Sequence, residues 1–98
     1  MIATQPVKIL VIDDHEVVRR GVKQILEENF AQVEVGEANT SRKGMAAVQQ
    51  QRWDLVILDI NLPDQSGLQL LGELHDTQPG LPLMVLSLHP EEQYAVRV

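Results

Sequence analysis

The residues best suited to chemistry are three aspartates and a serine, each placed where a run of apolar residues ends. Asp13 and Asp14 follow one run, Asp59 ends a second, and Ser87 ends a third. Carboxylates within a few ångströms of each other repel, and a hard, oxygen-preferring cation such as Mg²⁺ relieves that repulsion. An aspartate in contact with such a cation can attack a phosphoryl group and hold it as an acyl phosphate. A nearby hydroxyl group can bind the phosphoryl oxygens.

Each of these residues, taken singly, also fits an ordinary structural role. Asp14 could cap a helix, and Asp59 could open the turn before Pro63. Ser87 alone is a hydroxyl that finds an ordinary hydrogen-bond partner. The functional interpretation gains weight only if all of them converge, because independent turns would then have to bring three acids and a hydroxyl together by chance.

The elements that must position these residues are strands and helices in alternation. Apolar and β-branched runs predict four strands, at residues 7–12, 33–38, 54–59 and 83–87. Helical patterns follow them at residues 15–29, 41–51 and 68–77, and a last helix begins near Pro90. This alternation predicts an α/β fold, with one open parallel sheet and helices on both faces. Ligands bind beyond the carboxyl ends of such strands, which places the aspartates and the serine along one edge.

Details of the helices follow from the same patterns. Ser41 is expected to cap the second helix. The spacing of Leu68, Leu71 and Leu74 defines the third, which stops at the Gln78-Pro79-Gly80 stretch.

Composition excludes several classes of protein. The 98 residues fit one domain and include no cysteine, which rules out disulfides and thiolate metal sites and favours a reducing cytoplasm. No apolar run approaches the ~20 residues needed to span a membrane. The formal net charge is −6, and residues 53–98 carry one basic side chain against seven acidic ones, so direct nucleic-acid binding is not expected.

A few polar side chains are left with simpler interpretations. Arg19, Arg20 and Lys23 form a basic group, interpreted as a solvated helix face or, alternatively, a docking patch for an acidic partner. The three histidines do not share a metal-ligand spacing.

Taken together, the motifs resemble a known family. Ile9 to His15, Asp54 to Gly67 and Val85 to Ser87 are similar to the receiver domain of two-component response regulators. The Asp-Asp-His start and the Leu-Ser-Leu-His stretch resemble the NarL/FixJ-type (LuxR-type) subfamily. The resemblance runs from about Val7 to Val98 and implies a flavodoxin-like (CheY-like) fold.

The resemblance also implies a role for each residue. Asp59 would accept a phosphoryl group from a sensor histidine kinase. Asp14, Asp59 and the backbone carbonyl of Asn61 would bind Mg²⁺ or Mn²⁺, with Asp13 acting through water. Ser87 would bind the phosphoryl group as a switch residue. The output would be transcription, through a helix-turn-helix domain that this chain lacks.

The chain departs from the family pattern at its carboxyl end. Receivers have a fifth strand and helix, and a lysine at the end of that strand contacts the phosphoryl group. No lysine follows Lys43 here, so residues 1–98 are expected to be a receiver domain truncated to four strand–helix units. The fourth strand would then be a sheet edge through which copies of the chain could associate.

Two other functions compete with the phosphoacceptor. One is an interaction module on the same fold that works without phosphorylation, which the missing lysine allows. The other is a cobalamin-binding module, whose Asp-x-His-x-x-Gly motif is approached at Asp13 to Val18 but has valine in place of glycine. A dedicated enzyme acting on a free substrate is not expected, because no nucleophile–base pair exists beyond the acidic cluster.

Overall fold

A computed structural model describes residues 5–86 as a single layer of strands flanked by helices. The elements are β1 (Val7–Ile12), α1 (Glu16–Asn29), β2 (Val33–Ala38), α2 (Ser41–Gln50), β3 (Leu55–Asp59), α3 (Gly67–Thr77) and β4 (Leu83–Leu86). All described strand pairs are parallel, in the order β2-β1-β3-β4. The predicted flavodoxin-like sheet is thereby confirmed. The helix predicted from Pro90 lies outside the described residues.

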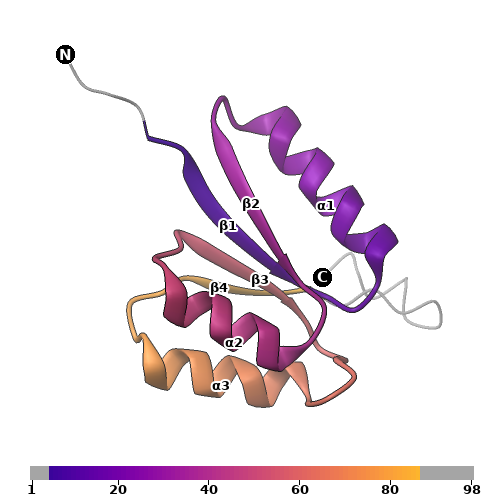
Figure 1. Cartoon of the computed structure of the whole chain (residues 1–98), viewed down its shortest axis with the longest axis vertical. Helices are drawn as coiled ribbons and strands as arrows, with labels where there is room; N and C mark the ends of the chain where they lie inside the picture. Colours follow the sequence, from indigo (N-terminus) through magenta and orange to yellow (C-terminus); the bar gives the residue numbers. More distant parts are fainter. Residues whose placement is uncertain (1–4, 87–98) are drawn as a thin grey trace.

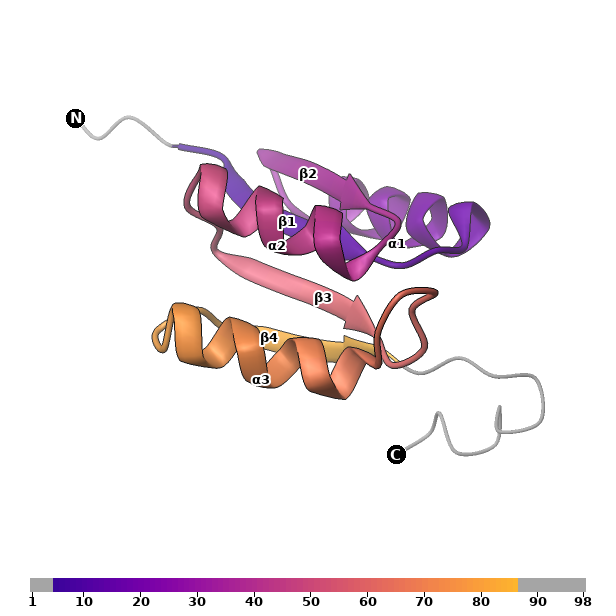
Figure 2. The same cartoon turned by 60° about the horizontal axis from the view of Figure 1, so that its bottom comes forward.

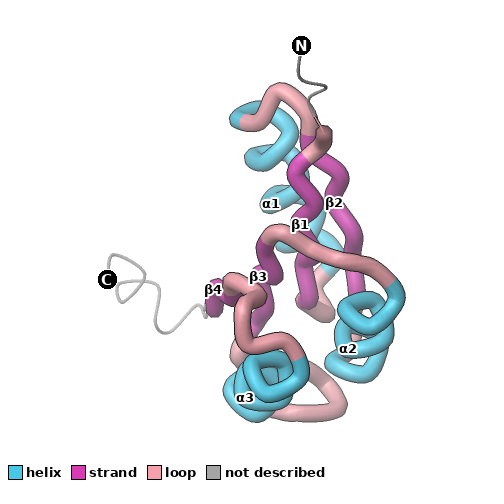
Figure 3. Tube along the Cα trace, turned by 90° about the vertical axis from the view of Figure 1, so that its left-hand side faces the viewer, coloured by secondary structure: helices cyan, strands magenta, loops and turns pink. Residues whose placement is uncertain are grey.

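The helices lie on opposite faces of the sheet because the chain reverses direction across it. The β1-to-β2 crossover runs one way and the β2-to-β3 and β3-to-β4 crossovers run the other way. Right-handed crossovers therefore put α1 on one face and both α2 and α3 on the other. Figures 1 and 2 show α1 alone on its side, with α2 and α3 next to each other. The tube in Figure 3 shows the same separation from the side.

The core lies mainly between the sheet and the α2–α3 face. Its largest members come from the two central strands and from α3, namely Leu10, Ile12, Leu58, Leu70 and Leu74, each no more than 1% exposed. The central strands β1 and β3 are covered on both faces, which explains why their sequences are continuous apolar runs.

One prediction about the helices was wrong in detail. Thr40, and not Ser41, is the N-cap of α2, since its Oγ1 accepts a hydrogen bond from the Lys43 N–H at 3.1 Å. The helix predicted at residues 68–77 is confirmed as α3, in which Leu70 and Leu74 are fully buried and Leu68 is 57% exposed. Helical spacing alone leaves the phase of the apolar face undecided between such neighbouring leucines.

The outer parts of the sheet are less covered. Within residues 5–86, β4 is an edge strand, and Met84 and Val85 are 51% and 36% exposed. None of the fourteen residues of α1 is buried, and Val17 and Ile25 face solvent. Association of two copies through β4 stays a prediction. No helix within the described residues is long and apolar enough to cross a membrane.

Candidate functional site at the carboxyl edge of the sheet

The register of the two central strands decides which acids meet. Ile12 on β1 is paired with Leu58 on β3, so the next residues along, Asp13 and Asp59, lie side by side. This is also the point where the strand order reverses, with β1 connecting to one side and β3 entering on the other. Such switch points are where open α/β sheets form crevices for ligands. Two acids, 46 positions apart in sequence, are thus neighbours through backbone pairing.

The site is a compact group of four side chains. Ligand atoms of Asp13, Asp14, His15 and Asp59 all lie within 4.8 Å of one another. Asp13 and Asp59 are 3% and 6% exposed, whereas Asp14 and His15 face solvent. The three aspartates converge, as predicted. His15, for which the sequence predicted no role at a metal site, lies with them.

His15 lies between the carboxylates of the acidic pair. Its backbone N–H donates to Asp13 Oδ1 at 2.8 Å, and its Nδ1 is 3.0 Å from the same oxygen and 3.1 Å from Asp14 Oδ1. The hydrogen bond with Asp13, followed by the charge of Asp14, raises the pKa of His15 above its ordinary value. The spacing between histidines does not indicate this contact, because His15 contacts Asp13 and Asp14, which are its neighbours in the sequence.

Asp59 is the acid whose environment most disfavours its charge. Burial, followed by the negative charge of Asp13, raises the pKa of the Asp59 carboxyl above its usual range. Backbone N–H groups of Asn61 and Ile60 act in the opposite direction by donating to the carboxylate. A buried carboxylate beside other carboxylates is a suitable ligand for a divalent cation.

The loop after Asp59 is folded tightly against the end of β3. The Gly67 N–H donates to the carbonyl oxygen of Ile60, and Asn61 and Ser66 form an antiparallel bridge. A Cβ at position 67 would collide with the Asp59 carbonyl and lie 2.7 Å from the Cα of Ile60. Only glycine therefore allows α3 to begin so close to the acceptor position. Ser66 caps α3 by accepting from the Leu68 N–H at 3.2 Å.

Arg19 is a second residue whose role the sequence analysis missed. Its Nη1 donates to the carbonyl oxygen of Asp13 at 2.6 Å, and its Nε binds Glu37 Oε1 at 2.9 Å. The side chain is 15% exposed, so Arg19 does not belong to a solvated face with Arg20 and Lys23. It joins the segment after β1 to β2 and fixes the backbone that carries the acidic pair.

The remaining predicted residues divide into two cases. Asn61 lies at the base of the loop after β3, close enough for its N–H to reach the Asp59 carboxylate. Ser87 lies outside the described residues. The roles assigned to all these residues stay predictions.

The donor set fits a divalent cation. Two buried carboxylates and one exposed carboxylate, together with a backbone turn, offer the oxygen ligands that Mg²⁺ and Mn²⁺ prefer. Burial and the charge of Asp13 both raise the pKa of Asp59, and a bound cation would favour the charged carboxylate against both.

Comparison with known proteins decides the family. The family model for the response regulator receiver domain matches residues 9–98. The chain belongs to the response regulator receiver family. The predicted resemblance is therefore confirmed, and the cobalamin alternative has no support.

Relatives of this receiver domain include transcription regulators. It is 37% identical over 87 residues to the DNA-binding transcriptional activator DevR/DosR of Mycobacterium tuberculosis, covering 89% of this chain and 40% of that protein. It is 34% identical over 92 residues to the nitrate/nitrite response regulator protein NarL of Escherichia coli, covering 94% and 43%. The chain thus spans about two fifths of the length of these relatives, and the NarL-type resemblance is confirmed.

Solved structures agree with the fold. A CheY-like response regulator receiver domain protein from Methanospirillum hungatei superimposes with a TM-score of 0.79 at 31% identity, over 94% of this chain and 73% of that one. A response regulator receiver domain protein from Clostridium thermocellum gives a TM-score of 0.77 at 30% identity, over 93% and 72%.

Proposed function

We propose that this receiver domain is a phosphoacceptor switch in which Asp59 takes a phosphoryl group from a sensor histidine kinase. Membership of the receiver family supports the signalling role. The observation that carries the proposal is the position of Asp59, a buried carboxylate beside two others where the central strands end. Histidine kinases are the partner class that the family implies.

The chemical step follows from the carboxylate. An Asp59 oxygen attacks the phosphorus of a phosphorylated histidine, a P–O bond forms, and the P–N bond to the departing imidazole breaks. The amides of Asn61 and Ile60 hold the attacking group in place. Ser87, at the end of the neighbouring apolar run, binds the transferred phosphoryl oxygens in this proposal. The domain would act as a phosphate carrier with at most slow self-catalysed gain and loss of phosphate.

We propose that the same residues hold a divalent cation. Asp14, Asp59 and the backbone carbonyl of Asn61 would hold Mg²⁺ or Mn²⁺, with Asp13 acting through a water molecule. When bound, the cation offsets charge on the carboxylates and on the incoming phosphoryl group. The acidic pair and Arg19, which fixes its backbone, prepare this half of the site.

The biological setting is inferred from the relatives. Because DevR/DosR and NarL are named as regulators, the output of this protein is proposed to be transcription, through a DNA-binding domain outside these 98 residues. The receiver domain itself would not bind nucleic acid, since its net charge is −6. It would work in the cytoplasm.

The test is phosphorylation by a small acyl phosphate in the presence of Mg²⁺, followed by intact mass measurement. We expect one added phosphoryl group in the wild type and none in Asp59→Asn. Asp54→Asn, at the opposite end of β3, is the matched control and should be modified normally. A phosphoryl adduct that survives in Asp59→Asn would show that Asp59 is not the acceptor.

The second candidate is an interaction module on the same fold that needs no phosphate. The same experiment separates the two functions, because an interaction module would bind Mg²⁺ at the acidic edge without forming any adduct at Asp59.

A further inference from the structure

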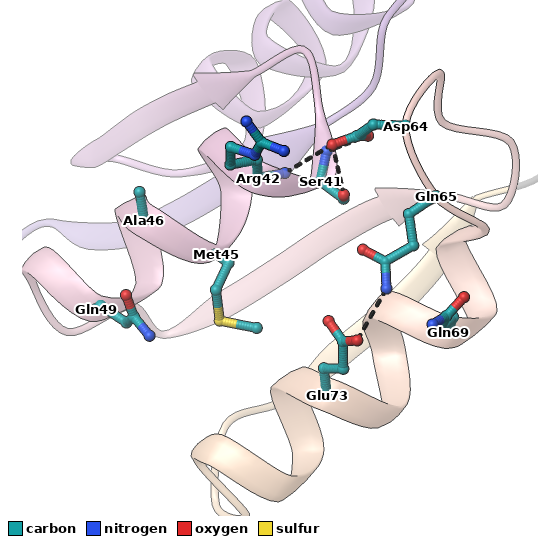
Figure 4. A pocket seen from close by; sticks show the side chains of 9 residues that line it. All are labelled: Ser41, Arg42, Met45, Ala46, Gln49, Asp64, Gln65, Gln69 and Glu73. Carbon is teal, nitrogen blue, oxygen red and sulfur yellow. Dashed lines mark hydrogen bonds between the residues drawn. The ribbon is translucent and has the colours of Figure 1, made fainter.

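The loop between β3 and α3 has a side-chain attachment that lies away from the acceptor. Asp64, near the tip of this loop, reaches across to the first turn of α2 (Figure 4). Its Oδ1 accepts the Ser41 N–H at 2.9 Å, and its Oδ2 accepts the Ser41 hydroxyl at 2.8 Å and the Arg42 N–H at 3.1 Å. The Asp64 carboxylate thus joins the loop to α2, through residues that lie 22 and 23 positions before it in the sequence.

These bonds complete the start of α2. The first backbone N–H groups of any helix lack partners within the helix. In α2 the Lys43 N–H is bonded to Thr40, and those of Ser41 and Arg42 are bonded to Asp64. A carboxylate at a helix N-terminus also interacts favourably with the helix dipole. In agreement, hydrogen bonding from the Ser41 N–H is the main reason that the pKa of Asp64 is lowered.

The other attachments of this loop lie at its base, in the core and on α3. Its base is closed by the Gly67-to-Ile60 hydrogen bond and the Asn61–Ser66 bridge, which hold the two ends together. Leu62 enters the core, and Gln65 donates to Glu73 of α3 at 3.0 Å. The bonds of Asp64 fix the loop to α2. Without them the loop, together with the backbone bonds at its base, would be held less firmly.

This loosening at the base of the loop would act on the site itself. Asn61, at the base of the loop, directs its N–H to the Asp59 carboxylate, and its carbonyl is the proposed backbone ligand of the metal. We infer that Asp64 is a positioning residue for the phosphoacceptor site, because its attachment to α2 holds the loop that places Asn61 beside Asp59. This inference rests on the proposed function, which assigns Asp64 no contact with the metal or the phosphoryl group.

The experiment compares Asp64→Ala and Asp64→Asn with a matched control, Asp54→Ala. Asp54 is also an exposed loop carboxylate that accepts a backbone N–H, from Lys8 at 2.7 Å, but at the far end of the sheet. Affinity for Mn²⁺ is measured from the electron paramagnetic resonance signal of free Mn²⁺. Residues that support metal ligands typically change affinity tenfold or more, so we expect about a tenfold weaker Mn²⁺ affinity in Asp64→Ala. Asp64→Asn keeps an acceptor oxygen and should lose less, and Asp54→Ala should match the wild type.

A second measurement separates positioning from simple loss of a helix cap. In the metal-free protein, amide hydrogen exchange is followed at Ser41, Arg42 and Gly67. We expect all three to exchange faster in Asp64→Ala. If only Ser41 and Arg42 change and Mn²⁺ affinity stays within twofold of the wild type, Asp64 is merely a cap and the inference is overturned.

Failure of the proposed function has a different signature. If wild-type Mn²⁺ binding is absent, or is unchanged in Asp59→Asn, then the metal site is wrong whatever Asp64 does. Protection of the Gly67 amide in Asp64→Ala would still overturn the inference in that case, because it would show that the loop keeps its position without the attachment. Asp64→Asn serves for both measurements if Asp64→Ala does not fold.

Discussion

The two ends of β3 carry the same residue type in opposite circumstances. Asp54, just before the strand, is exposed and accepts the Lys8 N–H at 2.7 Å. Asp59, the last residue of the strand, is 6% exposed and faces the negative charge of Asp13. Asp54 therefore stabilises the fold through an ordinary hydrogen bond, whereas burial and the charge of Asp13 disfavour the charged form of Asp59. The neighbours of an aspartate, and not its residue type, decide whether its carboxylate is stabilised or destabilised in the fold.

The largest effect should come from backbone crowding at the acceptor end. Gly67→Ala would push a Cβ into the Asp59 carbonyl and Ile60, which are backbone atoms that cannot rotate away. We expect a loss of about 3 kcal/mol in the free energy of unfolding, measured by chemical denaturation. Gly80→Ala, in the turn before β4, meets nothing within 4 Å and should change stability by less than about 0.5 kcal/mol. Equal losses of unfolding free energy in Gly67→Ala and Gly80→Ala would show that position 67 is no more crowded than position 80.

A divalent cation should stabilise the protein only through the acceptor end. At Mg²⁺ concentrations ten times the dissociation constant, binding to the folded state adds about 1.4 kcal/mol. We expect this gain in thermal unfolding of the wild type and of Asp54→Asn, and its loss in Asp59→Asn. An undiminished gain in Asp59→Asn would show that the cation binds elsewhere.

Neutralising the two aspartates should have opposite effects in metal-free buffer at neutral pH. Asp59→Asn removes a buried charge that repels Asp13, so the free energy of unfolding should rise by about 1 kcal/mol. Asp54→Asn weakens a charged hydrogen bond to the Lys8 N–H and should lower it by about 1 kcal/mol. Denaturation of the two variants side by side is the measurement, and changes of the same sign would contradict the comparison.

The smallest effect concerns acid stability. Hydrogen bonding to Ser41 lowers the pKa of Asp64 in the folded state. Ionised Asp64 therefore stabilises the fold at any pH above the pKa of the unfolded state, and this stabilisation is lost as the pH falls through the pKa of the folded state. Below about pH 4, the wild type should therefore lose stability more steeply than Asp64→Asn.

Asp59 should act in the opposite sense on acidification. The pKa of Asp59 is raised in the folded state, so its charged form lowers the free energy of unfolding. This destabilisation disappears as the pH falls through the pKa of the folded state towards that of the unfolded state. Asp59→Asn has no such group to protonate and should lose stability more steeply on acidification than the wild type. Urea titrations at several pH values below neutrality test both slopes, and identical slopes in all three proteins would contradict both assignments.

Local patterns were sufficient for most of the fold. β1 and β2 have the predicted bounds, Val7–Ile12 and Val33–Ala38, because a buried strand requires a run of apolar residues, and such a run can be recognised in the sequence. The acidic pair and Asp59 could be placed at one edge because the carboxyl ends of parallel strands share an edge. The phase of α3 could not be predicted, because Leu68 and Leu70 differ only in which neighbour they meet.

Residues close together in the chain were enough to predict the alternation of strands and helices, the family motifs and the carboxylates at the strand ends. The burial of each acid, the places of His15 and Arg19 beside the acids, and the bonds from Asp64 to α2 became visible only in the folded chain. Desolvation, charge repulsion and hydrogen-bond partners depend on distances in space, and those distances follow from the register of β1 against β3 and the folding of one loop.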